Sequence, residues 1–340
     1  MDTSLSIGLI GAGRIGRVHA ANITHRIPGA RVHVVADVNV KAARSCADDI
    51  GAAFASTYRD VVDDAGIDAV VICSSTDTHA EIIEAAAEAG KHVFCEKPIS
   101  LDLVDIDRAL DSVRRNGVQL QIGYNRRFDA NFRRIRDAVA DGEIGTPHLL
   151  HIISRDPSPP PIEYVRRSGG MFVDMTIHDF DMARFLVGSE VEEVFAAAAV
   201  RVDPAIGEAG DVDTAVLTLR FADGTIGTID NSRQAVYGYD QRAEVFGSLG
   251  SVRTDNDYPN AVQRFGAEGL RRDPPLHFFI ERYAESYVTE MEAFVEAVRD
   301  GTDVPVTGVD GRISVVMGMA ARRSFEQNRP VRLGEVDPGA

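Results

Sequence analysis

A glycine-rich turn near the N-terminus constrains the fold more than any other feature of this sequence. It directly follows an apolar run, residues 7–10, and consists of Gly11, Ala12, Gly13, Arg14, Ile15 and Gly16. In a strand-turn-helix unit the first glycine allows a tight turn, the second lets the backbone approach a pyrophosphate, and the third lets the helix pack on the strand. A glycine-rich turn without a ligand is the alternative. The preceding strand favours a dinucleotide site formed by these six residues.

Short β-branched runs and helical patterns alternate up to Ile122, which predicts a doubly wound parallel sheet, the Rossmann form of the α/β class. The expected strands are residues 6–10, 32–36, 69–73, 92–95 and 118–122, and the expected helices are residues 14–26, 40–50, 79–89 and 102–115.

Asp37 ends the second expected strand, about twenty residues beyond the glycines. A carboxylate there accepts hydrogen bonds from a ribose diol and repels a 2′-phosphate, so NAD is expected in preference to NADP. The alternative role is an N-cap for the helix at residues 40–50.

The polar segment after the third expected strand lies where ligands of doubly wound sheets bind. We expect Ser74, Thr76 and His79 to contact the cofactor. Capping of the next helix by Asp77 or Thr78 is the alternative.

The pattern changes after residue 123, where consecutive strands predict an α+β domain with a mixed or antiparallel sheet. Its expected strands are residues 148–154, 191–202, 214–221, 225–231 and 243–246, and its expected helices are residues 131–140, 172–187, 279–299 and 311–327. We therefore predict an NAD-binding domain at 1–123, a substrate-binding and oligomerisation domain at 124–333, and a flexible tail at 334–340.

The candidate chemistry begins with Glu96-Lys97-Pro98, which closes the fourth expected strand. A cis Lys97-Pro98 bond is expected to aim the Lys97 ammonium into a cleft, whereas an exposed loop lysine is the alternative. In the expected helix at 172–187, Asp174 and His178 are four positions apart, so the carboxylate would orient the imidazole as a general base. The alternative is a solvated Asp-His pair.

Charge and cysteine content exclude several classes of function. Lys and Arg number 36 against 52 Asp and Glu, a net charge of −16, which argues against binding to nucleic acids or anionic membranes. The three cysteines show no CxxC spacing, so neither a zinc site nor a disulfide framework is expected, and we predict no metal. No basic leader or membrane-spanning run is seen, which predicts a cytoplasmic protein.

From about Leu5 to Leu333 the sequence resembles the Gfo/Idh/MocA family of NAD(P)-dependent oxidoreductases, and within it the inositol 2-dehydrogenases. The resemblance rests on GAGRIG, on EKP at residues 96–98, on Asp-x-x-x-His after Gly-Gly, and on PPPIEY at residues 159–164. It implies a triad of Lys97, Asp174 and His178 and cofactor contacts that include Glu96 and Lys97. It also implies a polyol pocket lined by the three triad residues together with Arg127, Asp156 and Tyr237. It also implies an open second sheet and a homotetramer.

The implied reaction is NAD-dependent oxidation of a ring alcohol, such as myo-inositol to 2-keto-myo-inositol, with His178 as the base. Dehydrogenases of scyllo-inositol, of another inositol isomer or of an aldose share these motifs, and the family resemblance also extends to NAD-assisted glycosidases. A non-catalytic NAD-sensing regulator would need the same Rossmann half, but it would have no reason to keep Lys97, Asp174 and His178 together.

Overall fold

The computed structural model describes residues 4–337 as two compact units. The first unit ends at Phe128 and resumes over Glu285–Ile313, and the second covers Asp129–Ala284 and resumes at Ser314. The described part excludes residues 1–3 and residues 338–340. The expected absence of a leader rests partly on the first of these ranges, and the second belongs to the predicted tail. Among the described residues, no helix is both long and apolar enough to cross a bilayer.

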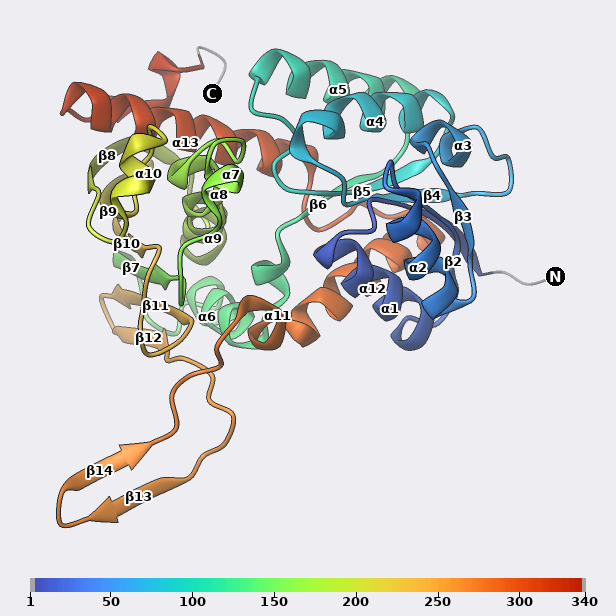
Figure 1. Cartoon of the computed structure of the whole chain (residues 1–340). Helices are drawn as coiled ribbons and strands as arrows, with labels where there is room; N and C mark the ends of the chain where they lie inside the picture. Colours follow the sequence, from blue (N-terminus) through green and yellow to red (C-terminus); the bar gives the residue numbers. More distant parts are fainter. Residues whose placement is uncertain (1–3, 338–340) are drawn as a thin grey trace. The chain divides into compact units, whose positions relative to one another are not determined.

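The first unit contains a parallel sheet of six strands in the order β3-β2-β1-β4-β5-β6 (Figure 1). The strands are β1 (Leu5–Ile10), β2 (Ala30–Ala36), β3 (Ala53–Ala55), β4 (Ala69–Ile72), β5 (His92–Glu96) and β6 (Leu120–Gly123). This is the strand order of dinucleotide-binding sheets, so the predicted fold class is confirmed for this half. Strand β3 was not predicted, because it is an edge strand of three mostly exposed residues, too short to give a strand pattern in the sequence.

Helices cover both faces of this sheet (Figure 1). They are α1 (Arg14–Arg26), α2 (Val40–Ile50), α3 (Tyr58–Val62), α4 (Thr76–Glu88) and α5 (Leu103–Asn116). The 3-10 turn η1 (Asn125–Phe128) follows β6. Local signals fix their ends: Asp102 caps α5 by accepting from the Val104 N–H, and Gly117 ends it in the left-handed conformation.

Helix α12 (Ala284–Asp300) also belongs to the first unit, apart from its first residue. Its Met291 and Phe294 are fully buried in one core cluster with Ile7, Leu9 and Ile23. This return of the chain to the first unit was not predicted, because the change of pattern in the sequence indicated one boundary, at residue 123.

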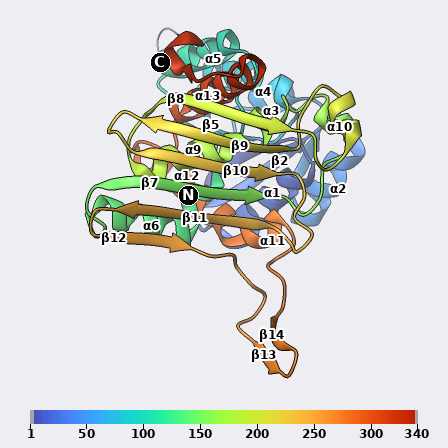
Figure 2. The same cartoon turned by 90° about the vertical axis from the view of Figure 1, so that its left-hand side faces the viewer.

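The second unit contains a mixed sheet of seven strands in the order β12-β11-β7-β10-β9-β8-β15. They are β7 (Pro147–Arg155), β8 (Val191–Ala199), β9 (Thr214–Phe221), β10 (Ile226–Ser232), β11 (Asp240–Gly247), β12 (Gly250–Thr254) and β15 (Val331–Arg332). Only the β7–β10 pair among these neighbours is parallel. Buried and exposed residues alternate along β9, and Figure 2 shows the sheet face that no helix covers.

The remaining elements of the second unit correct two predicted helices and add a hairpin that was not predicted. They are α6 (Ala130–Ala140), α7 (Ile162–Val165), α8 (Met171–Asp174), α9 (Thr176–Val187), α10 (Pro204–Glu208), α11 (Phe279–Arg282), α13 (Gly308–Gln327, whose first turns belong to the first unit), the hairpin β13 (Gln263–Gly266) and β14 (Gly269–Arg272), and the 3-10 turn η2 (Leu333–Glu335). The helix expected at 172–187 is two helices, the one expected at 279–299 is also two, and the β13–β14 hairpin was not predicted. At the start of the predicted tail, Glu335 pairs with Arg329 at 2.8 Å.

Candidate functional site

The glycine-rich turn has the geometry expected of a dinucleotide site. Gly11 has a φ of +103°, and a Cβ on it would lie 2.4 Å from the Cys73 backbone. A Cβ on Gly16 would lie 1.9 Å from the Gly11 carbonyl oxygen, so both positions require glycine. At Gly13, the N-cap of α1, a Cβ would meet nothing within 4 Å. Open space at the N-terminus of α1 fits the phosphates of NAD.

Asp37 is attached to this turn by its carboxylate. Its Oδ2 accepts from the Ala12 N–H at 2.7 Å, and its Oδ1 accepts from the Asn39 N–H at 2.7 Å. The alternative role as the N-cap of α2 is wrong, because Asn39 is the N-cap and accepts from the Ala42 N–H. The negative charge of Asp37 therefore lies beside the turn, where the preference for NAD requires it.

The segment after β4 is ordered by its own hydroxyl groups. Ser74 Oγ lies 2.7 Å from Thr78 Oγ1, which also donates to the Ser75 carbonyl at 2.8 Å. Helix α4 begins at Thr76, with Ser75 as its N-cap, so capping by Asp77 or Thr78 is wrong. Ser74 and Thr76 are half-buried and stay predicted cofactor contacts.

His79 is buried behind this segment. Its Nδ1 lies 2.8 Å from the Pro98 carbonyl oxygen and its Nε2 lies 3.1 Å from the Ser74 carbonyl oxygen. Burial lowers the pKa of His79, against the opposing effect of these two carbonyls. The ring thus joins the two loops that carry Ser74 and Lys97, a positioning role that was not predicted from the sequence.

His79 contacts the Glu96-Lys97-Pro98 segment at Pro98, and His19 contacts it at Glu96. His19 is fully buried, and its Nε2 lies 2.8 Å from Glu96 Oε1. The Lys97-Pro98 bond is cis, as expected. Lys97 is half-buried, which disfavours the alternative of an exposed loop lysine.

Arg127 follows β6 in the 3-10 turn η1. Its Nη2 lies 2.9 Å from Asp310 Oδ1, and both side chains are largely buried. The other carboxylate oxygen of Asp310 accepts from the Thr307 N–H and hydroxyl. The predicted pocket residue Arg127 is thereby fixed in the first unit by a partner that lies 183 positions away and gave no signal in the sequence.

In the second unit, a cluster of polar side chains surrounds the carboxylate of Asp174. The Tyr164 hydroxyl donates to Oδ1 at 2.7 Å, and Arg233 Nη2 donates to Oδ2 at 3.0 Å. Arg233 also lies 3.6 Å from Asp156, a predicted pocket residue. Burial and the charge of Asp174 raise the pKa of Tyr164, so this hydroxyl stays a donor.

The helix breaks between the two predicted catalytic residues of this unit. Asp174 ends α8 and His178 lies in the first turn of α9, so the expectation of one continuous helix is wrong. The buried Thr176 hydroxyl donates to Asn231 Oδ1 at 2.6 Å, which anchors the start of α9 to β10. Asn231 in turn donates to the fully buried Asp179 at 2.8 Å. These hydrogen bonds fix the first turn of α9, which carries the half-buried His178.

Tyr237 lies in a second polar cluster of this unit, with Asp240 and Arg155. Its hydroxyl donates to the fully buried Asp240 at 2.5 Å and accepts from Arg155 Nη1 at 3.1 Å. Burial and the bond to Asp240 raise the pKa of Tyr237. Its role in the polyol pocket stays a prediction.

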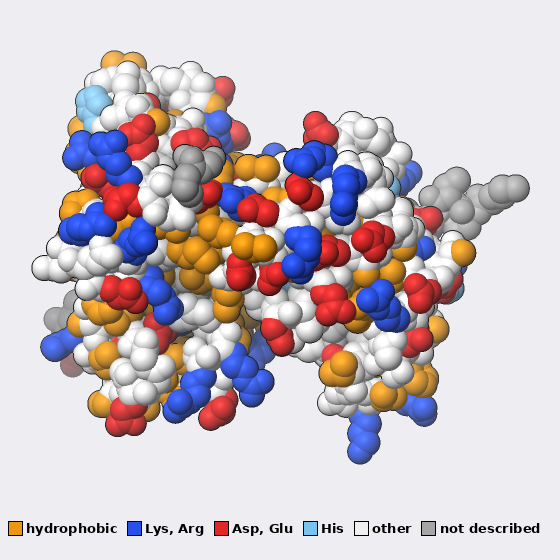
Figure 3. All heavy atoms as spheres, turned by 90° about the horizontal axis from the view of Figure 1, so that it is seen from above, with side chains coloured by type: hydrophobic (Ala, Val, Ile, Leu, Met, Phe, Trp, Pro, Cys, Tyr) orange, Lys and Arg blue, Asp and Glu red, His pale blue; other side chains and the backbone are white. Residues whose placement is uncertain are grey.

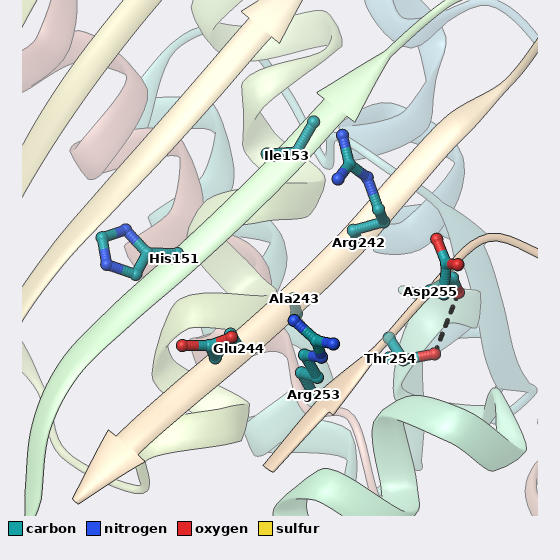
Figure 4. A pocket seen from close by; sticks show the side chains of 8 residues that line it. All are labelled: His151, Ile153, Arg242, Ala243, Glu244, Arg253, Thr254 and Asp255. Atoms are coloured by element: carbon teal, nitrogen blue, oxygen red, sulfur yellow. Dashed lines mark hydrogen bonds between the residues drawn. The ribbon is translucent and has the colours of Figure 1, made fainter. Parts of the chain in front are cut away.

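A separate hollow of about 390 Å³ lies on the uncovered sheet face (Figure 4). It is lined by His151, Ile153, Arg242, Ala243, Glu244, Arg253, Thr254 and Asp255, and it contains none of the predicted site residues. Acidic and basic side chains are interspersed on the face shown in Figure 3, which has no continuous basic patch.

The described residues offer no group of three or more His, Cys, Asp or Glu side chains placed to hold a metal ion. Cys46, Cys73 and Cys95 are free and buried, and burial raises the thiol pKa of each.

Two family models match most of the chain. One is described as "Oxidoreductase family, NAD-binding Rossmann fold" and matches residues 5–124, and the other is the GFO/IDH/MocA C-terminal domain, which matches residues 132–253.

Individual proteins match over almost their full lengths. The chain is 50% identical to myo-inositol 2-dehydrogenase of Thermotoga maritima, covering 98% of this chain and 99% of that protein. It is 46% identical to inositol 2-dehydrogenase of Rhizobium meliloti, covering 97% and 99%. The structure of scyllo-inositol dehydrogenase from Lactobacillus casei with bound NAD(H) and scyllo-inositol matches with a TM-score of 0.91 at 32% identity, covering 97% and 99%.

Proposed function

Because this chain belongs to the Gfo/Idh/MocA family of oxidoreductases with an NAD-binding Rossmann fold, we propose that it oxidises myo-inositol to 2-keto-myo-inositol with NAD. The observation that carries the proposal is the arrangement around Asp174, whose carboxylate is held by Tyr164 and Arg233 two residues before the helix that bears His178. A neutral polyol suits this cluster, which offers many hydrogen-bonding groups.

In the proposed mechanism His178 accepts the proton of the reacting hydroxyl group, and Asp174 orients and stabilises the imidazolium that forms. The ammonium of Lys97 stabilises the negative charge that develops on the substrate oxygen. When bound, NAD supplies the hydride acceptor. The turn at Gly11–Gly16 and the Asp37 carboxylate hold it, and the negative charge of Asp37 selects against a 2′-phosphate.

Two similar proteins are named as scyllo-inositol dehydrogenases, so scyllo-inositol is the alternative substrate for this chain. The test is the formation of NADH by the purified protein with NAD or NADP and a panel of myo-inositol, scyllo-inositol, other inositol isomers and aldoses. We expect the highest kcat/KM with myo-inositol and NAD. Net NADH formation from free inositol also excludes an NAD-assisted glycosidase, and a lack of turnover with every inositol would overturn the proposal.

A Lys97→Ala variant completes this test. Loss of a group that stabilises the transition state is expected to lower kcat by about 10² to 10³. Binding of NADH, followed by its fluorescence, should change little. An active Lys97→Ala variant would exclude the proposed role of Lys97.

We also propose that the protein forms a homotetramer in the cytoplasm. Phe246, Leu149 and Ile226 are cross-strand neighbours on β11, β7 and β10, and each is about two-fifths exposed on the uncovered sheet face. Such an exposed apolar row supports contact with another copy. The free cysteines support a reducing compartment.

A further inference from the structure

Helix α1 carries a buried histidine on the face that packs against the parallel sheet. His19 follows Gly16, the last glycine of the dinucleotide turn, by three positions, and this spacing places both residues on one face of the helix. Gly16 packs on the Gly11 carbonyl, and His19 and Ile23 of the same face are fully buried. His19 therefore lies inside the first unit, on the helix whose N-terminus is to hold the phosphates of NAD.

Aromatic rings hold the imidazole of His19 in place. The centroid of the imidazole lies 5.1 Å from that of Phe94 on β5 and 5.8 Å from that of Tyr287 on α12, and both contacts are edge-to-face. All three elements belong to the first unit at these residues, and both neighbouring rings are buried. A ring packed in this way cannot turn freely, so the direction of its nitrogen atoms is fixed.

Only one nitrogen of this imidazole has a partner. Nε2 of His19 lies 2.8 Å from Oε1 of Glu96, whereas Nδ1 is buried and has no hydrogen-bond partner within residues 4–337. The neutral imidazole carries one proton, and a buried N–H group without an acceptor is costly. The favoured tautomer therefore has its proton on Nε2, and His19 donates to Glu96.

The Glu96 side chain is confined on its other side by β6. Glu96 pairs with Gly123 in the parallel ladder of β5 and β6, and a Cβ on Gly123 would lie only 3.0 Å from Oε2 of Glu96. The Glu96 side chain is accordingly only 14% exposed. Lys97 is the next residue of the chain, so a carboxylate held by His19 and packed against β6 restricts the backbone from which the Lys97 side chain extends.

We propose that His19 is a positioning residue for Lys97. Through Glu96 it fixes the Lys97 ammonium relative to the helix that holds the phosphates of NAD. The inference rests on the proposed function, because that function gives Lys97 its role at the substrate oxygen. A polar pair that only stabilises the fold is the alternative, and it predicts a loss of stability without a specific loss of turnover.

The first test compares three variants in the oxidation of inositol. His19→Phe keeps an aromatic ring against Phe94 and Tyr287 but removes the donor, and it should lower kcat about 10-fold to 100-fold with little change in the KM for NAD or in NADH binding. His19→Gln keeps an N–H donor for Glu96 and should recover most of this loss. Ile23→Val, the control, shortens a buried side chain on the same face of α1 and should keep the wild-type kcat.

The second test asks whether the effect of His19 passes through Lys97. In a double-mutant cycle, the Lys97→Ala/His19→Phe protein should turn over within about threefold of Lys97→Ala alone, because His19 has nothing left to position once the ammonium is gone. Losses that multiply would assign to His19 an effect that is independent of Lys97, and they would overturn the proposal.

Hydrogen exchange followed by mass spectrometry gives a readout that needs neither substrate nor cofactor. In His19→Phe, peptides that cover residues 93–100 should exchange faster than in the wild type, whereas peptides of the second unit should not change. The Ile23→Val control should leave the exchange of residues 93–100 unaltered. Far-UV circular dichroism checks folding, and His19→Leu, a smaller residue without a donor, replaces His19→Phe if that variant does not fold.

Three further results would contradict the role of His19. They are a wild-type kcat in His19→Phe, equal losses in the Phe and Gln variants, and unchanged exchange at residues 93–100. A wild-type protein that is inactive with every inositol would overturn the proposed function instead. The exchange data would then still decide whether His19 holds the segment that carries Lys97.

Discussion

Arg233 and Asp174 form a buried ion pair although they lie 59 positions apart, with Nη2 of Arg233 3.0 Å from Oδ2 of Asp174. Their side chains are 4% and 9% exposed. Burial acts to lower the pKa of Arg233, but the charges of Asp174 and Asp156 outweigh it and hold that pKa above its ordinary value. Arg233 therefore stays cationic and holds the carboxylate that precedes His178.

Replacing Arg233 should lower the stability of the protein. Arg233→Gln leaves the Asp174 carboxylate buried without its cation, which is expected to cost about 3–5 kcal/mol of the free energy of unfolding. Urea denaturation measures this loss. The control is Arg220→Gln, because Arg220 pairs with Glu193 at 3.6 Å on the surface, where an ion pair contributes about 0–1 kcal/mol. Equal losses in the two variants would show that the buried pair is not a special source of stability.

The proposed base predicts a pH profile. His178 must be neutral to accept a proton, so turnover with inositol should rise with pH across the range near 6.5 where imidazoles titrate. His178→Asn should lower kcat by about 10² to 10⁴ and remove this acidic limb. A pH–rate profile of both proteins checks the prediction, and an acidic limb that persists in the variant would assign the titration to another group.

Cofactor choice should depend on the charge of Asp37. Like charges a few ångströms apart cost about 1–4 kcal/mol, so the wild type should prefer NAD over NADP by at least about tenfold in kcat/KM. Asp37→Asn keeps an oxygen for the Ala12 N–H and removes the charge, and it should narrow that preference. Asp48→Asn makes the same change of charge at an exposed position of α2 and serves as the control. Comparable kcat/KM values for both cofactors in the wild type would contradict the assignment.

His79 should make the stability depend on pH. Because burial lowers its pKa in the folded state, the unfolded chain takes up a proton first as the pH falls below about 6.5. Its contribution to the free energy of unfolding is therefore complete above that pH and declines as the pH falls toward the lower folded value. His79→Gln keeps a hydrogen-bond donor and cannot titrate. When the pH is lowered from 7.5 to about 5.5, its free energy of unfolding should therefore fall less than that of the wild type. Urea denaturation at several pH values measures the difference, and parallel curves for the two proteins would rule out this contribution.

The sequence predicted much of the first unit because its signals are local. The glycines of the turn and the apolar strands β1, β2, β4 and β5 each depend on residues close to one another in the chain. The hairpin between β9 and β10 also has a local signal, because Asp223-Gly224 lies between its two strands. The structure gives it a three-residue loop, however, with Gly224 at a φ of +91° and the Phe221 N–H donating to the Thr225 carbonyl.

Local patterns failed where a distant partner decides the conformation. The break at Met175 lies in a stretch without glycine or proline, and it accompanies the hydrogen bond from Thr176 to Asn231 on β10, 55 positions away. The β13–β14 hairpin was missed because its strands carry no buried face and therefore no clear alternation of apolar and polar residues.

By itself, the sequence determined the Rossmann sheet, the glycine turn with Asp37, and the choice of Lys97, Asp174 and His178 as candidates, since residue type and short spacing carry these features. Only the tertiary structure decided which groups hold the candidates in place. Arg233 reaches Asp174 across 59 positions and His19 reaches Glu96 across 77. Such pairs form when packing excludes water and brings remote segments together, and the order of residues along the chain does not specify that proximity.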